Sequence, residues 1–191
     1  ADLRERLLQD SGFSANALFP YQAALDDMDA QSLQFPMYDC RQTLPYETGS
    51  VDLIFIHHFL EHLNPDEALR FLKECRRLIK PDVGGMRIVV PNAAFLMGLY
   101  VNDSDRLNDY VHINDGVEQA KTSMDKLNAL LHAGHQSFYD VNNLAMMLHE
   151  AGFVSTLRKF RESKQSQILK ETTEMDFGGI SLFMDACCRV S

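Results

Sequence analysis

The sequence contains no tryptophan, and it has only four cysteines among its 191 residues. No pair of these cysteines has the CxxC spacing of a metal or redox site, so we expect reduced thiols in a cytoplasmic protein. No apolar run reaches the roughly 18 residues that span a bilayer, and no signal peptide is visible. Basic residues are also few, because 18 Lys and Arg face 27 Asp and Glu, for a formal net charge of -9. This balance argues against a nucleic-acid surface and favours a small molecule or another protein as partner.

Residues 51–63 are the most informative segment about function. Their first six residues are apolar apart from Asp52, and this run stops at a polar cluster of three histidines and Glu61. A buried parallel strand has this pattern where it reaches the edge of its sheet and gives way to a ligand site. We therefore expect His57 and His58, at the carboxyl end of the strand, to line a site.

A helix and a second strand follow this segment. Asn64 and Pro65 predict a helix start, as N-cap and first helical residue, and Pro81 predicts its end. Residues 86–90 are again apolar. The order strand, helix, strand is one βαβ unit, which implies a parallel sheet with a right-handed crossover.

The later part of the chain extends this pattern. We expect residues 93–135 to form an insertion that acts as a lid over the site, polar and mobile over 103–115. A further helix is expected after Asp140, followed by closing strands within 153–160 and 180–188.

The length is suited to one core, so residues 1–191 are expected to form a single α/β domain. The expected fold is a Rossmann-like, mostly parallel sheet with helices on both faces and an antiparallel C-terminal strand.

His58, Glu61 and His62 also match the zinc-peptidase pattern H-x-x-E-H. That chemistry needs both histidines on one helix, with the glutamate activating a metal-bound water. A new helix at Asn64 and a strand directly before the pattern both argue against such a helix. A zinc-dependent peptidase therefore remains only a remote alternative, no metal site is expected, and His62 is expected to point back toward the sheet.

Several motifs, taken together over roughly residues 37–190, resemble the class I S-adenosylmethionine-dependent methyltransferases, in particular the type 11 group. In that family the pieces keep this order and approximate spacing. They are DCRQTLPY at 39–46, GSVDLI at 49–54, LEHL at 60–63, ECRRLIKP at 74–81, RIVVPN at 87–92, GH at 134–135, FYD at 138–140 and LHEAGF at 148–153.

The resemblance implies a cofactor, S-adenosylmethionine, and a small-molecule methyl acceptor. It also implies that Asp39 and Cys40 contact the adenine ring, with Asp39 accepting a hydrogen bond from the exocyclic amine. By the same resemblance, His57 and His58 line the methionine portion of the cofactor, and Asn92 lies on the acceptor side.

A histidine near the strand ends suits the removal of a proton from the acceptor, because its ordinary pKa lies near neutrality. His58 is the first candidate for this base, and His135 with Tyr139 is the second. The motif that contains His135 and Tyr139 is equally compatible with an ordinary helix start, so both interpretations stay open.

One element of the family pattern is not recognisable. A glycine-rich loop should follow the first strand, yet the only glycine before Asp39 is Gly12. Asp26, Asp27 or Asp29 could hold the ribose hydroxyls. Two functional classes therefore stay open: an active methyltransferase whose N-terminal part is incomplete or diverged, and a methyltransferase-like module that binds without catalysis.

Overall fold

The computed structural model describes residues 38–113, 119–132, 134–163 and 179–188. From Asp39 onward these residues belong to one compact unit. The expectations for a glycine-rich loop and for a ribose-binding aspartate fall in residues 1–37, outside the described residues.

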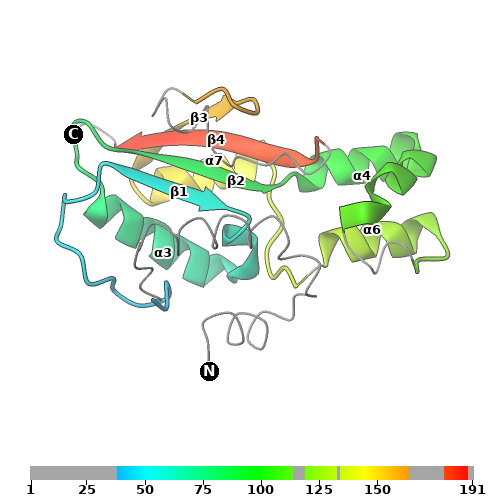
Figure 1. Cartoon of the computed structure of the whole chain (residues 1–191), viewed down its shortest axis with the longest axis horizontal. Coiled ribbons are helices and arrows are strands. Elements are labelled where there is room, and N and C mark those ends of the chain that lie inside the picture. The colour runs from blue at the N-terminus through cyan, green and yellow to red at the C-terminus, as the bar shows by residue number, and fades with distance from the viewer. Residues whose placement is uncertain (1–37, 114–118, 133, 164–178, 189–191) are drawn as a thin grey trace, which may run out of the picture. The chain divides into compact units, whose positions relative to one another are not determined.

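A four-stranded sheet forms the centre of this unit (Figure 1). Its spatial order is β1 (Leu53–His57), β2 (Gly85–Pro91), β4 (Ser181–Cys188) and β3 (Phe153–Arg158). β1 and β2 are parallel, whereas β4 runs antiparallel to both of its neighbours. Three of the four strands therefore point the same way, and the one reversed strand is the C-terminal strand expected from the sequence.

The connection between β1 and β2 is α3 (Pro65–Leu78). The Asn64 side chain accepts a hydrogen bond from the Glu67 amide, and the Glu67 carboxylate accepts one from the Asn64 amide. This reciprocal capping box fixes the helix start two residues after His62. The predicted βαβ unit is confirmed.

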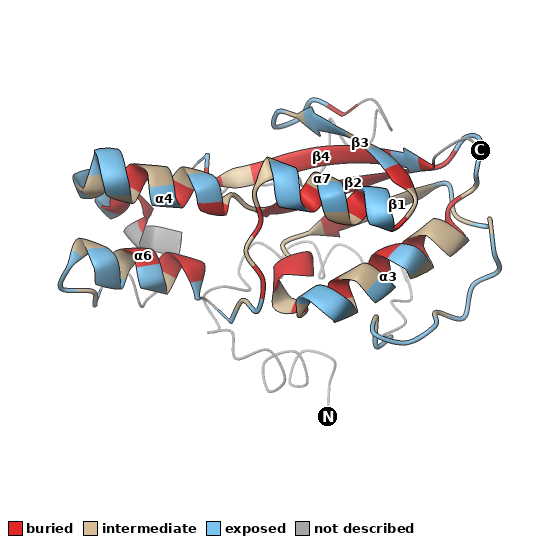
Figure 2. Cartoon of the chain, turned by 180° about the vertical axis from the view of Figure 1, so that it is seen from behind, coloured by how far each residue is buried: buried red, intermediate tan, exposed pale blue. Residues whose placement is uncertain are grey.

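Two helices cover one face of the sheet. α3 and α7 (Val141–Glu150) share a core with alternate residues of β2, namely Met86, Ile88 and Val90. Figure 2 shows both helices in front of the sheet, with buried residues along their inner sides. Among the described residues only this face carries helices, so the expectation of helices on both faces is met on one side.

The predicted insertion is a separate group of helices: α4 (Ala93–Asn102), the 3₁₀ segment η2 (Ser104–Ile113) and α6 (Ser123–Leu131). They surround their own small apolar core. The expectation of a polar, mobile stretch over 103–115 was wrong for its first part, because Leu107 is fully buried in this core.

Other sequence-based details also differ from the structure. A turn begins at Cys40, held by a hydrogen bond from the Gln42 amide to the Asp39 carbonyl. All four cysteines are free thiols, as expected, although Cys187 is exposed. Among the described helices, none is long and apolar enough to cross a membrane.

A buried ion pair links the two central strands on the face opposite α3 and α7. Arg87 of β2 lies directly across from Asp185 of β4, with 3.0 Å between its Nη1 and the Asp185 Oδ1. The Arg87 side chain is fully buried and also donates to the Lys159 carbonyl, while Ser163 donates to Asp185. Arg158 approaches the second carboxylate oxygen at 3.2 Å.

Replacing Asp185 with Asn should strongly destabilise the fold, because the Arg87 guanidinium would remain buried without a counter-charge. We expect the free energy of unfolding, measured with urea, to fall by about 3–5 kcal/mol. Asp52→Asn is the matched control. It removes an exposed pair with Lys80 and should cost about 0–1 kcal/mol. Equal losses in the two variants would contradict this interpretation of the buried pair.

Candidate functional site

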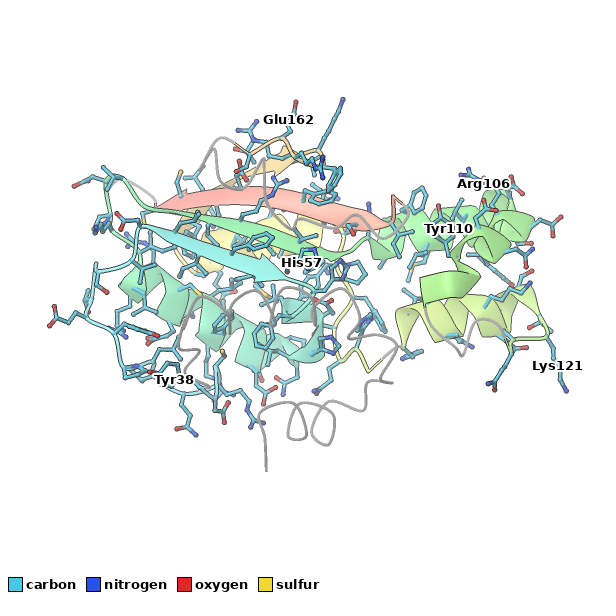
Figure 3. All side chains as sticks on the ribbon, in the orientation of Figure 1. Tyr38, His57, Arg106, Tyr110, Lys121 and Glu162 are labelled. Atoms are coloured by element: carbon cyan, nitrogen blue, oxygen red, sulfur yellow. The ribbon has the colours of Figure 1, made fainter. Side chains whose placement is uncertain are left out.

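The candidate site lies at the carboxyl end of β1, where the chain changes direction sharply. β1 ends at His57, which is labelled in Figure 3. The next residue, His58, has a φ of 47°, in the left-handed region that non-glycine residues rarely adopt. This turn leads the chain from the strand into the short 3₁₀ helix η1 (Leu60–His62), and it places the His58 ring between two polar partners.

The His58 ring lies between the carboxylate of Glu61 and the hydroxyl of Ser181. Its Nδ1 lies 3.2 Å from Oε1 of Glu61, and its Nε2 lies 3.2 Å from Oγ of Ser181, the first residue of β4. The Glu61 side chain is buried, with only 1% of its surface exposed. Carboxylate, imidazole and hydroxyl therefore lie in sequence, the order in which a carboxylate orients a histidine that exchanges a proton with a hydroxyl.

A second segment, residues 134–139, runs alongside η1 and is bonded to it repeatedly. The Glu61 carbonyl accepts hydrogen bonds from the amides of Gln136 and Ser137, at 2.8 and 3.0 Å. Gln136 and Ser137 also donate from their side chains to the carbonyls of His62 and Leu63. We call this set of bonds the η1 clamp. It brings the predicted residues His135 and Tyr139 to the end of β1, more than 70 residues away in sequence.

His62 and His135 face each other across the η1 clamp. Their rings meet edge to face with centroids 5.0 Å apart. Nδ1 of His62 lies 3.2 Å from the Gly134 carbonyl, and Nδ1 of His135 lies 2.8 Å from the Leu131 carbonyl. His62 therefore packs against the second segment, and the expectation that it points back toward the sheet was wrong.

Burial shifts the pKa values of two residues in this segment. Burial lowers the pKa of His135, although the nearby Glu61 carboxylate acts in the opposite direction. Burial raises the pKa of Tyr139 to about 12. The Tyr139 hydroxyl donates to the Leu60 carbonyl at 3.4 Å, and its ring lies in the main core. Tyr139 thus supports the η1 clamp, whereas His135 lies closer to solvent.

Asp39 and Cys40 lie in a loop along α3. Both oxygens of Asp39 accept from the Arg41 guanidinium, at 2.9 and 3.0 Å, and this hydrogen bond lowers the pKa of Asp39 to about 2. Arg41 is also within electrostatic range of Glu67, in the first turn of α3. Cys40 is within electrostatic range of Cys75, in the C-terminal half of the same helix, so the loop follows α3 over several turns. Cys40 is half-buried against the main core, and burial raises its pKa.

Asn92 has a local structural role. Its side chain caps α4 by accepting from the Phe95 amide, and its own amide donates to the Ile180 carbonyl. The neighbouring Ala93 amide donates to the Tyr139 carbonyl. Asn92 therefore links the end of β2 to the start of β4 and to the η1 clamp.

The structure brings His57, His58 and His135 together at one edge, but it does not support the helix that a zinc peptidase would need. His58 lies in a turn outside any helix, and within the pattern at 58–62 only residues 60–62 are helical. The sequence interpretation missed Ser181 as a member of the site, and it named Glu61 without its burial or its contact with His58. Nothing in the local pattern marks Ser181, because β4 reaches His58 from a distance of 123 residues in the chain.

Comparisons with known proteins show similarity to one family over part of the chain and to several solved structures in fold. Residues 14–85 match the sequence model of a family described as a methyltransferase domain. No curated protein matches the chain significantly. Among solved structures, the PH0226 protein from Pyrococcus horikoshii OT3 is similar, with 15% identity and a TM-score of 0.51 over 97% of this chain and 76% of that chain.

Two further solved structures share the fold. The YcgJ protein from Bacillus subtilis matches at 13% identity, with a TM-score of 0.50 over 89% of this chain and 78% of that chain. An O-methyltransferase family protein from Burkholderia thailandensis matches at 14% identity, with a TM-score of 0.50 over 88% of this chain but only 40% of that chain. This chain thus spans less than half the length of the Burkholderia protein.

The ion pair between Asp39 and Arg41 can be tested by titration. Because the folded-state pKa of Asp39 lies below its ordinary 3.8, the pair contributes stability above pH 3.8, and this contribution disappears as the pH falls through about 2. Arg41→Gln should raise the Asp39 pKa toward 3.8, as followed by NMR of the carboxyl group. An unchanged Asp39 titration in this variant would show that Arg41 is not the cause of the shift.

Proposed function

We propose that this chain transfers the methyl group of S-adenosylmethionine to a small-molecule acceptor. The premise is that the chain carries a class I S-adenosylmethionine-dependent methyltransferase domain. The premise rests on the family match over residues 14–85 together with the shared fold. The acceptor and the residue roles below are our proposal.

The observation that carries the proposal is the series Glu61, His58 and Ser181 at the carboxyl edge of the parallel strands. Open α/β sheets bind their ligands at this edge. A carboxylate 3.2 Å from Nδ1 favours the imidazole tautomer with its proton on Nδ1, which leaves the Nε2 lone pair to accept a proton. Nε2 faces the Ser181 hydroxyl, so His58 is our proposed general base, acting on the acceptor directly or through Ser181.

The residues proposed to hold the cofactor suit its chemistry. The Asp39 carboxylate is ionised over the physiological range, and its two oxygens accept from the amide and guanidinium of Arg41 and from the side chain of Gln42. The Gln42 contact is the longest of these, at 3.4 Å, so an exocyclic amine would take its place on Asp39. Cys40 offers a half-buried, weakly polar neighbour for an apolar ring. His57 ends β1, where the methionine portion is expected by the family resemblance.

Bound S-adenosylmethionine supplies an activated methyl group on a sulfonium, so the protein has mainly to position, shield and deprotonate. We assign positioning to Asp39, Cys40 and His57, and deprotonation to His58, with His135 as the second candidate base. α4, η2 and α6 follow β2 directly and extend beyond the carboxyl ends of β1 and β2 (Figure 1), where they would cover the acceptor. Asn92, at the base of α4, would border that space.

Composition supports the remaining parts of the proposal. The net charge of -9 is unfavourable for nucleic acid as the acceptor. Four free thiols are typical of a reducing compartment, so we propose a cytoplasmic location.

Calorimetry with the full chain tests cofactor binding. We expect S-adenosylmethionine and S-adenosylhomocysteine to bind, and Asp39→Ala to weaken binding by about tenfold. Asp52→Ala is the control, since Asp52 is an exposed aspartate paired with Lys80 at the opposite end of β1. Absence of binding by the unaltered chain at millimolar ligand would contradict the enzyme proposal and favour the non-catalytic module.

The base is tested with a panel of small-molecule acceptors, by following S-adenosylhomocysteine release. His58→Asn retains a residue type that tolerates positive φ, and it should lower kcat about 100-fold or more without preventing cofactor binding. His149→Gln, an exposed histidine near the end of α7, should retain full activity. If both variants turn over at the same rate, His58 is not the base.

A further inference from the structure

We infer that Glu61, His62 and His135 form a binding site for a divalent first-row transition-metal cation. Each residue offers one ligand atom, and these three atoms lie within 4.8 Å of one another. The site adjoins the proposed base but does not depend on methyl transfer, so it can be tested without the cofactor.

The spacing of the three ligand atoms is close to that of a bound state. Metal–ligand bonds of about 2.1 Å at tetrahedral angles place donor atoms about 3.4 Å apart. The side chains would therefore draw together by about an ångström on binding. His62 and His135 are only half-buried, whereas the backbone beneath them is fixed by the η1 clamp, so this movement needs side-chain rotation alone.

The backbone contacts of both histidines select the tautomer that a metal requires. Nδ1 of His62 and Nδ1 of His135 each face a carbonyl oxygen, of Gly134 and Leu131 respectively. A carbonyl can only accept, so in both rings Nδ1 carries the proton, and Nε2 of the neutral ring keeps its lone pair. Histidines that bind metals commonly donate their other N–H to a backbone carbonyl in this way.

The buried Glu61 carboxylate is a second, independent observation in favour of a bound cation. Its side chain is 1% exposed, Oε1 has only the His58 imidazole at 3.2 Å, and Oε2 accepts no hydrogen bond from any described residue. A buried carboxylate is costly unless it is paired or bound to a metal. His58, 3.2 Å from Oε1, approaches one oxygen only, and it would orient the carboxylate while Oε2 binds the cation.

Folding alone does not explain this carboxylate. The η1 clamp uses the main-chain carbonyl of Glu61, which would be available from any residue at this position. The buried side chain adds a desolvation cost to the clamp, which the single contact with His58 offsets only at Oε1. A cation held between Glu61 and the two imidazoles would offset that cost.

The donor set indicates the class of metal. Imidazole nitrogens favour zinc and neighbouring transition metals over Mg²⁺ and Ca²⁺, which prefer oxygen ligands. Two histidines and one carboxylate also leave coordination positions open, as in catalytic zinc sites. Those positions could bind water or an oxygen of the acceptor. This arrangement uses His135 in place of His58, and so it differs from the peptidase pattern.

The test is metal binding by the full chain without S-adenosylmethionine. We expect Zn²⁺ titrated by calorimetry to bind with one-to-one stoichiometry, to raise Tm, and to remain bound in the presence of millimolar Mg²⁺. Co²⁺ should give the visible absorption of a nitrogen- and oxygen-ligated ion. Glu61→Gln, His62→Gln and His135→Gln should each weaken Zn²⁺ binding by more than about 100-fold, and His58→Asn by about 10–100-fold.

His149→Gln is the control and should bind Zn²⁺ like the unaltered chain. Thermal unfolding without metal checks each variant for folding; if Glu61→Gln fails to fold, His62→Gln and His135→Gln still decide the question. Absence of stoichiometric Zn²⁺ binding, or equal affinity in His135→Gln and His149→Gln, would overturn the proposal. Either result would leave the cofactor titration, and hence the proposed methyltransferase function, unaffected.

Discussion

The candidate site depends on the η1 clamp, the set of hydrogen bonds between residues 60–63 and residues 134–139. Short 3₁₀ segments have poor internal hydrogen bonding and do not persist alone. Here the free carbonyls of η1 are occupied by amides and side chains of Gln136 and Ser137. The same bonds fix His62 against His135, so every proposed role at this edge presupposes the clamp.

The carboxyl end of β1 differs from the rest of the sheet in how its buried charge is compensated. The described part of the chain contains two strongly buried carboxylates, and they have different surroundings. Asp185 is surrounded by Arg87, Arg158 and Ser163, which satisfy it and make it part of the fold. Glu61 has only the approach of His58 at one oxygen. A buried carboxylate that is only partly paired costs folding free energy, so Glu61 does not stabilise the fold as Asp185 does.

Sequence reasoning predicted the local elements well where strong signals stand side by side. The apolar run before His57 predicts β1, and the Asn64–Pro65 cap predicts the start of α3. Both elements are determined by residues close together in the sequence. Sequence reasoning failed where contacts between residues distant in the chain determine which side chains are buried. Leu107 is buried by partners in α4 and α6, and the polar residues around it in sequence gave no indication of this.

The same limit applies to the site. His57 and His58 were predicted because a strand end is visible in the sequence. Glu61 was visible as part of a zinc pattern, but its burial comes from packing around η1. Ser181 lies at the start of an apolar strand, and only the strand order brings it to His58. Pairing of Glu61 and His62 with His135 likewise requires knowledge of the η1 clamp.

The position of β4 has a consequence for how this domain is made. β4 occupies the middle of the sheet, between β2 and β3, although it comes after both in the sequence. During synthesis, the long apolar edge of β2 therefore has no lasting partner until residues 181–188 have left the ribosome. An unpaired strand edge is a template for association with other chains, and late non-local pairing slows folding. We expect the nascent chain to need protection over this interval, since Ser181 and its strand complete the sheet and the site in one step.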